Sequence, residues 1–322
     1  MQNRLSKGPL HNENGHLCEA GYATSLVKKY DRSRVATSRL RIKEWDYYAI
    51  CSPDAVLALT IADNGYMGLD SVTLIDIPTR WQHTRSFMRA LPLGKTALPD
   101  TSERGVTQIE RKGYALRFEN DGEKRTLTVR VEKFFDGKPL EGKIVLTGEP
   151  RDSIVIATPF PGKPKTFYYN QKINCLQAEG TVTFDGASRA FRHATAMPVL
   201  DWGRGVWTYC NTWYWGSVSG RVEGVPFGLN LGYGFGDTSA ASENMLFYDG
   251  VAHKLGRLTF GIPQTAEGKD DFLKPWTIRE DDDRLRLTFT PVLDRASLTS
   301  ALVIESDQHQ VFGYYAGAAV LD

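Results

Sequence analysis

The chain lacks long apolar segments, closely spaced cysteines and a signal peptide. No apolar run approaches the roughly 20 residues that a membrane-spanning helix needs. The four cysteines are far apart and form no Cys-x-x-Cys pair, which excludes the common zinc and thioredoxin motifs. The first twenty residues are polar and lack the apolar core of a signal peptide. We therefore expect a cytoplasmic protein with reduced thiols and no integral membrane association.

An excess of charge of one sign is also lacking. The 39 Lys and Arg residues face 38 Asp and Glu residues, so the formal net charge is +1. No global field attracts nucleic acid, and we expect no nucleic-acid partner. The one local excess lies between Lys28 and Lys43, where seven basic residues accompany only Asp31. A solvated edge strand that carries Lys and Arg explains this run more simply than a phosphate site.

Metal and cofactor motifs are absent as well. The six histidines show neither His-x-His nor His-Glu-x-x-His spacing, so we expect no metal site. The glycines at 232, 234 and 236 superficially resemble a dinucleotide fingerprint, but Asp237 stands where the third glycine should be, and no βαβ pattern surrounds it. There is no Gly-x-Ser-x-Gly elbow. We therefore predict no cofactor.

What the chain has instead is alternation of apolar and polar residues between frequent turns. Apolar residues take every second place in segments 127–132 and 285–290, as in half-buried antiparallel strands. Asp-Gly pairs at 121, 185 and 249 are typical of hairpin turns. The sequence predicts an all-β fold with few short helices, for which residues 78–91 and 239–245 are the candidates.

A proline-rich segment near the midpoint predicts a domain boundary. Residues 158–166 contain three prolines, which cannot donate hydrogen bonds to a sheet. No repeat of 20 to 50 residues is visible, which argues against a propeller or solenoid. Antiparallel chains commonly remove their sheet edges by closing into barrels. We expect two antiparallel β-barrel domains, residues 1–160 and residues 161–322.

The most distinctive segment is Asp201–Gly220, which contains four of the seven tryptophans. If this segment were one extended strand, alternate residues would form an aromatic wall on one face. Such a wall suits either a dense core or the lining of an apolar pocket. The candidate ligand-binding residues are Arg204, Trp207, Tyr209, Asn211, Trp213, Trp215, Asn230 and Asn244.

Three carboxylates close to this segment are the candidate catalytic acids: Asp201, Asp237 and Glu243. A carboxyl group in an apolar pocket can deliver a proton at neutral pH, whereas one paired with arginine stays ionised. We expect Asp201 to bind a basic or amide partner, with Arg204 the foremost candidate. The alternative is that all three serve structure, as ion pairs and backbone caps.

Several motifs together resemble a known family. They are Asp201-Trp-Gly-Arg-Gly-Val-Trp207, Trp213-x-Trp215, Phe227-Gly-x-Asn-Leu-Gly-x-Gly-Phe-Gly-Asp237, Glu243-Asn244 and Arg41-x-Lys43-x-Trp45-Asp-Tyr-Tyr48. They resemble the bacterial family called domain of unknown function 2804, over essentially the whole chain. That family is distantly similar to lipocalin-like proteins of the hydroxyneurosporene synthase (carotenoid 1,2-hydratase) type. The resemblance implies a double calycin-type barrel and an apolar ligand of isoprenoid or lipid type.

Three functions follow from these observations. The first is binding of an apolar small molecule near the domain junction, with acid-catalysed hydration or cyclisation as an added activity. The second is a carbohydrate-active protein that stacks sugars on tryptophan and uses two carboxylates as acid and base. The third is a scaffold in which the aromatic residues only join the two halves.

Overall fold

The computed structural model is built almost wholly of antiparallel strands. It describes residues 2–301 and 304–321, which form 24 strands and one short 3-10 helix, Arg32–Arg34. The all-β prediction is confirmed. No helix in these two ranges is long and apolar enough to cross a membrane.

The central layer is an eight-stranded sheet in the order β2-β12-β13-β16-β4-β5-β6-β7. Most of its strands carry long runs of buried residues because both faces are covered. Its strands are β2 (Gly21–Ala23), β4 (Lys43–Cys51), β5 (Ala55–Asp63), β6 (Met67–Asp76), β7 (Trp81–Ala90), β12 (Ile154–Pro159), β13 (Phe167–Ile173) and β16 (Met197–Val206).

A six-stranded sheet, in the order β15-β14-β11-β10-β9-β8, covers one face of the central sheet. Its strands are β8 (Gly105–Arg111), β9 (Tyr114–Asn120), β10 (Arg125–Phe135), β11 (Lys138–Thr147), β14 (Gln177–Phe184) and β15 (Ala187–Phe191). In β10 the alternation predicted from the sequence is confirmed, because Leu127, Val129 and Val131 are buried and Thr128 and Arg130 are not. These residues join the largest apolar core of the molecule, and each fully buried aliphatic side chain adds about 1.5–3 kcal/mol of burial energy.

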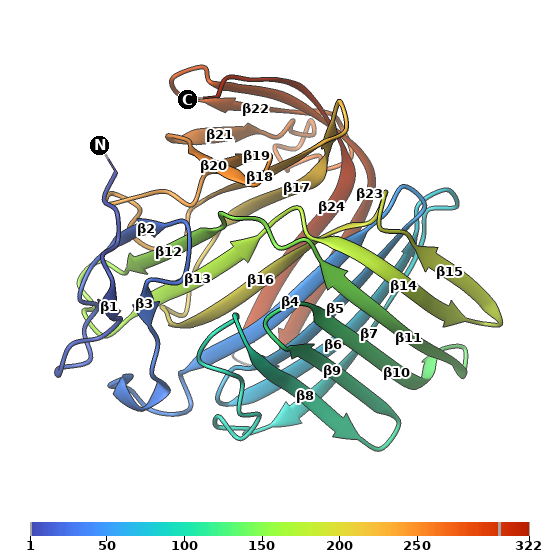
Figure 1. Cartoon of the computed structure of the whole chain (residues 1–322), viewed down its shortest axis with the longest axis horizontal. Coiled ribbons are helices and arrows are strands. Elements are labelled where there is room, and N and C mark those ends of the chain that lie inside the picture. The colour runs from blue at the N-terminus through green and yellow to red at the C-terminus, as the bar shows by residue number, and fades with distance from the viewer. Residues whose placement is uncertain (1, 302–303, 322) are drawn as a thin grey trace.

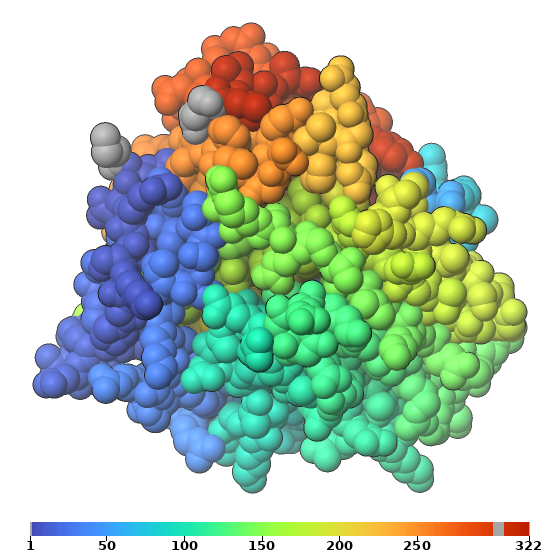
Figure 2. Space-filling model, in the orientation of Figure 1, coloured from blue at the N-terminus to red at the C-terminus, as the bar shows by residue number. Residues whose placement is uncertain are grey.

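The C-terminal part of the chain forms two four-stranded sheets, β17-β18-β19-β20 and β21-β22-β23-β24. Most of their strands lie at the top of Figure 1, whereas the long strands β23 and β24 run from there down behind the central sheet. Figure 2 shows their orange and red residues packed on the rest of the molecule. Their strands are β17 (Tyr214–Val222), β18 (Val225–Tyr233), β19 (Met245–Tyr248), β20 (Val251–Lys254), β21 (Leu258–Gly261), β22 (Trp276–Glu280), β23 (Leu285–Ala301) and β24 (Ile304–Ala319). A short parallel pair, β1 (Gly8–Pro9) and β3 (Lys28–Lys29), completes the fold.

Two adjacent residues of β4 show how the layers are stacked. Tyr48 contacts Phe118 of the six-stranded sheet, with ring centroids 5.2 Å apart. Its neighbour Tyr47 contacts Trp215 of β17, with ring centroids 6.4 Å apart. Successive side chains of a strand point to opposite faces. The central sheet therefore lies between the six-stranded sheet and the C-terminal sheets.

The predicted boundary near residue 160 does not coincide with a change of sheet. Residues 160–166 form the turn of a hairpin, and Pro159 of β12 pairs with Phe167 of β13 within the central sheet. Pro161 and Pro164 thus occupy a turn, where no ladder hydrogen bond is needed, and Pro159 is the last residue of β12. The chain leaves the central sheet for the last time at residues 207–213, after β16. In the described parts of the chain, no sheet closes on itself by pairing its first strand with its last.

Other local expectations have mixed outcomes. The Asp-Gly pairs at 185 and 249 form hairpin turns in which both residues have positive φ, as predicted. The helix expected within residues 78–91 is wrong, because this segment forms the edge strand β7. The apolar residues of this segment have helical spacing, but the segment instead pairs with β6 along the whole length of that strand. Residues 239–245 contain no helix either.

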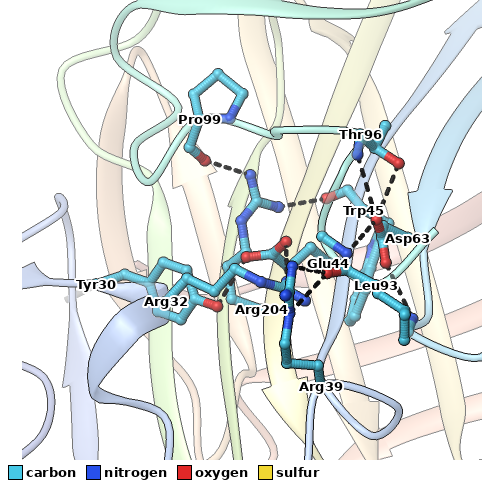
Figure 3. A network of polar contacts seen from close by, with 12 residues as sticks. Tyr30, Arg32, Arg39, Glu44, Trp45, Asp63, Leu93, Thr96, Pro99 and Arg204 are labelled. Atoms are coloured by element: carbon cyan, nitrogen blue, oxygen red, sulfur yellow. Dashed lines mark hydrogen bonds and ion pairs between the residues drawn. The ribbon is translucent and has the colours of Figure 1, made fainter.

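A buried polar network joins β16 to its neighbour β4 and to the loop before β8 (Figure 3). Arg204 is fully buried, forms an ion pair with Asp46 at 3.1 Å, and donates to the carbonyl oxygens of Trp45, Gly203 and Pro99. Arg204 and Asp201 are an odd number of residues apart on one strand, so they point to opposite faces. The predicted pair between them is therefore wrong.

We predict that replacing Arg204 with methionine lowers the free energy of unfolding by about 3–5 kcal/mol, because Asp46 is left buried without its cation. Chemical denaturation measures this loss. The double variant Arg204→Met/Asp46→Asn should recover part of it, because it removes the unpaired charge. A loss below about 1 kcal/mol in the single variant would contradict a stabilising role for the network.

Candidate functional site

The aromatic segment that the sequence predicts as one strand is two strands joined by a loop. β16 ends at Val206, residues 207–213 form the loop, and β17 begins at Tyr214. The single-strand prediction is therefore wrong. Trp207 and Trp213 pack against Phe235, with ring centroids 5.3 Å and 5.7 Å away, whereas Trp215 packs against Tyr47.

A buried lysine stands at the centre of the junction between the central sheet and β17–β18. Lys172 of β13 is only 2% exposed. Its ammonium nitrogen lies 2.8 Å from Oε2 of Glu243, 2.7 Å from Oδ1 of Asn170 and 3.0 Å from the hydroxyl of Tyr168. Tyr168, Asn170 and Lys172 alternate along β13, so the period of the strand puts them on one face.

Glu243 reaches this lysine from the loop that precedes β19. Asn230 of β18 donates to both the backbone carbonyl and the carboxylate of Glu243, at 2.8 Å and 3.1 Å. The indole of Trp215 donates to Oδ1 of Asn230 at 2.8 Å. The close approach needs a glycine, because a Cβ at Gly232 would lie 2.5 Å from a carboxylate oxygen of Glu243.

Asp201 completes the cluster from the neighbouring strand. It lies directly opposite Lys172 in the pairing of β13 with β16. Its carboxylate accepts from the amide of Asn170 at 2.6 Å and lies 3.9 Å from the ammonium of Lys172. The expected amide or basic partner of Asp201 is therefore present, and the amide is that of Asn170.

Lys172 and Tyr168 are the protonated members of this cluster. Burial alone would lower the pKa of Lys172, but Glu243, Tyr168 and Asp201 outweigh it and raise this pKa above the usual value of lysine. Burial strongly raises the pKa of Tyr168. At neutral pH, Lys172 is therefore an ammonium and Tyr168 a neutral phenol that can donate a hydrogen bond.

A small hollow borders the cluster. It encloses about 220 Å³ of empty space, part of it open to solvent, and leaves room for little more than a water molecule. Its lining is mainly apolar and aromatic, with Glu243 as its carboxylate: Ile156, Thr158, Tyr168, Tyr233, Phe235, Thr238 and Glu243. Trp207 and Trp213 pack on Phe235 and so stand beside this hollow.

The structure thus divides the predicted site residues. Asp201, Glu243, Trp215 and Asn230 meet around Lys172, and Trp207 and Trp213 lie beside the hollow.

The others lie elsewhere. Hydrogen bonds from the side chain and then the backbone of Ser239 lower the pKa of Asp237. Asn244 bonds to the backbone of residues 232 and 256. Asn211 stabilises its own loop through Thr208, and Tyr209 is 90% exposed.

Sequence reasoning did not identify Tyr168, Lys172, Tyr233 and Phe235 as site residues. The run Asn170-Gln-Lys172-Ile-Asn174 is visible in the sequence, but turn chemistry explained it equally well. A lysine inside a strand is usually exposed. The burial of Lys172 could therefore be inferred only from the position of the sheet that covers it.

We predict that replacing Lys172 with methionine destabilises the protein by about 3–5 kcal/mol near neutral pH, because two partly buried carboxylates lose their cation. Chemical denaturation measures the effect. The variant Lys172→Met/Glu243→Gln is the control and should be more stable than the single variant at neutral pH; equal stability would contradict the ion pair.

Two solved structures share the fold. A protein from Nitrosomonas europaea solved as an AttH-type protein has a TM-score of 0.57 and is 12% identical, over 92% of this chain and 95% of that chain. Kievitone hydratase from Nectria haematococca has a TM-score of 0.51 and is 12% identical, over 96% of this chain and 97% of that chain. At this identity the likeness shows the fold, which is lipocalin-like.

A search of curated protein sequences finds no match to the chain. The family comparison agrees with the resemblance seen in the sequence motifs. The protein-family model described as "Domain of unknown function (DUF2804)" matches residues 2–322, and the chain belongs to this family.

Proposed function

We propose that the protein binds a small molecule with an apolar body, of isoprenoid or lipid type, in the hollow beside Glu243. The observation that carries this proposal is a carboxylate, held in place by a buried lysine, in the wall of an aromatic hollow at the junction of the two halves. Ligand sites commonly combine an apolar lining with a few fixed polar groups. Glu243 would accept a hydrogen bond from the ligand, and Tyr168 would donate one.

Entry of a ligand requires the aromatic side chains around Phe235 to move. Phe235 packs against Phe160, Tyr168, Trp207 and Trp213 through edge-to-face contacts. Trp213 is 49% exposed, so turning it outward breaks few contacts. Displacing Phe235 would enlarge the hollow toward the loop 207–213. The ligand would then replace the ring contacts with its own apolar surface.

We predict that Phe235→Ala lowers the affinity for an uncharged apolar probe, N-phenyl-1-naphthylamine, by about tenfold or more. The reason is that the variant loses the ring, which supplies roughly 1.5–3 kcal/mol of apolar contact to the probe. Probe fluorescence measures binding, with farnesol as competitor. The matched control is Phe272→Ala, another half-buried phenylalanine, which packs on Trp276 and His309 in the C-terminal half. Equal affinities of the two variants would overturn the location of the site.

Water addition to a bound alkene is a second candidate function, favoured by the water-sized space next to Glu243. The ammonium at 2.8 Å stabilises the carboxylate, which weighs against Glu243 as the direct acid. As a base, the same carboxylate could take a proton from water while the water oxygen bonds to an alkene carbon polarised by a carbonyl group. The phenol of Tyr168 would protonate the adjacent carbon, and the proton on Glu243 would return to Tyr168 through Lys172.

We predict that the protein adds oxygen-18 water to citral, a conjugated isoprenoid aldehyde, and that Glu243→Gln abolishes this reaction while probe binding stays within about threefold. Mass spectrometry of the product measures the reaction. Asp237→Asn serves as control, because Asp237 lies outside the lining of the hollow. No hydration above the buffer rate, or equal rates for the wild type and Glu243→Gln, would refute the catalytic proposal and leave the binding proposal in place.

The two other functions remain weaker proposals. In a carbohydrate-active protein, two carboxylates must be available as acid and base, but Asp201 and Glu243 both serve Lys172. A pure scaffold would not need a carboxylate in the wall of a hollow. Mass spectrometry of molecules extracted from the purified protein separates the three functions, since an apolar compound, a sugar or no compound would each select one. The cytoplasmic location expected from the sequence remains a prediction.

A further inference from the structure

One end of the central sheet gathers five segments that are far apart in the sequence. The pairing of Phe167 with Val206, of Gly205 with Lys43 and of Glu44 with Asp63 places the ends of β13, β16, β4 and β5 in one row. β6 and β7 continue this row, because Met67 pairs with Ala90. The segments 39–43, 64–66, 91–95, 160–166 and 207–213 lie at this row or beyond it and form one end of the molecule, which we call the rim.

The rim exposes large apolar side chains, and the segments that carry them adjoin one another. Tyr209 is 90% exposed, Leu91 54%, Trp213 49% and Leu40 45%. The backbone of Tyr66 bonds to both Leu40 and Leu91, so these three residues adjoin. Solitary exposed apolar residues need no explanation, but a contiguous group on adjoining loops commonly marks an interaction site.

Cations without acidic partners stand among these side chains. Arg41 lies over the ring of Tyr209 at 5.3 Å, and Lys43 lies between the rings of Tyr66 and Trp207, at 5.2 Å from each. Lys163 and Lys165 are exposed in the turn next to Phe235. None of these four cations forms an ion pair with a carboxylate among the described residues. Asp237 lies on an adjoining loop, where its backbone bonds to Pro159, and it is partly exposed.

We propose that the rim docks on the surface of an anionic phospholipid bilayer. Aromatic tips beside lysine and arginine match the interface of a bilayer, where the rings reach the headgroup level and the cations meet lipid phosphates. Each cation near an anionic surface contributes about 1 kcal/mol, so four cations with several apolar side chains support reversible binding. The net charge of +1 for the whole chain does not oppose this, because screening limits the interaction to charges within about 10 Å.

The position of the rim gives the docking a purpose that rests on the proposed ligand site. Trp207 and Trp213 belong to the rim and also pack on Phe235, which lines the hollow beside Glu243. Insertion of the loop 207–213 into the headgroup region would pull these side chains away from Phe235. An apolar molecule could then pass from the bilayer to the hollow without crossing water.

Sedimentation with ligand-free vesicles tests the docking apart from the ligand site. The full chain should sediment with phosphatidylcholine vesicles that contain phosphatidylglycerol, and not with pure phosphatidylcholine vesicles. Tyr209→Ser and the charge reversal Lys163→Glu/Lys165→Glu should each weaken binding by about tenfold or more. The matched controls are Tyr314→Ser, at a 60% exposed tyrosine of β24, and Lys112→Glu/Lys124→Glu, in turns of the six-stranded sheet. Equal binding of a rim variant and its control would overturn the proposal.

The exposed Cys210 gives a second readout at the rim itself. In a Cys18→Ser background, which removes the other exposed thiol, an environment-sensitive fluorophore on Cys210 should shift to the blue when anionic vesicles are added. An unshifted spectrum with sedimenting protein would mean that another surface binds the vesicles, and would also overturn the proposal. A rim that binds an acidic protein but no vesicle refutes it as well. Failure here leaves the probe-binding test of the hollow unaffected, so the two proposals fail separately.

Discussion

The buried ammonium of Lys172 imposes the constraint on which the junction depends. An ammonium removed from water is stable only when carboxylates and polar oxygens replace its hydration. Glu243 supplies the charge from the C-terminal half, while Asp201, Asn170 and Tyr168 complete the shell from the central sheet. The two halves are therefore held together by a polar centre inside an aromatic interface.

Other features of β18 follow from this requirement. Glu243 can reach Lys172 only if the strand between them leaves space, and Gly232 leaves it. Asn230 then fixes the carboxylate by donating to it, and the indole of Trp215 orients Asn230. The glycines that superficially resembled a nucleotide fingerprint thus serve the close packing of a carboxylate against a strand. The same packing exposes one edge of Glu243 to the hollow, which is why a structural ion pair is also the candidate ligand contact.

Local patterns in the sequence were sufficient for the fold class. Alternation identified β10 and the first residues of β23, 285–290. The Asp-Gly pairs at 185 and 249 located hairpin turns, because the backbone conformation of such a turn is decided by neighbouring residues alone. The prolines near residue 161 do not distinguish a linker from a hairpin turn, because proline, which cannot donate to a sheet, suits both places equally well. The site was only half predictable. Its carboxylates lay beside a conspicuous aromatic segment, whereas Lys172 became a site residue through pairing of β13 with β16 and coverage by β18, which no local pattern records.

The tryptophans of segment 201–220 show why the strand argument failed and what replaced it. Alternation gave Trp207, Trp213 and Trp215 one common face, but the chain changes sheets between Val206 and Tyr214 and so interrupts the period. The change of sheet gives these residues different roles. Trp202 is buried between the central and six-stranded sheets, and Trp215 supports the polar centre at the junction. Trp207 and Trp213 sit where the loop meets the hollow, so one of them can contact the ligand-site ring and solvent at the same time. A crossing between two sheets must be long enough to leave one layer and reach the next, and here that crossing carries Trp207, Tyr209 and Trp213 at a place where the junction approaches the surface.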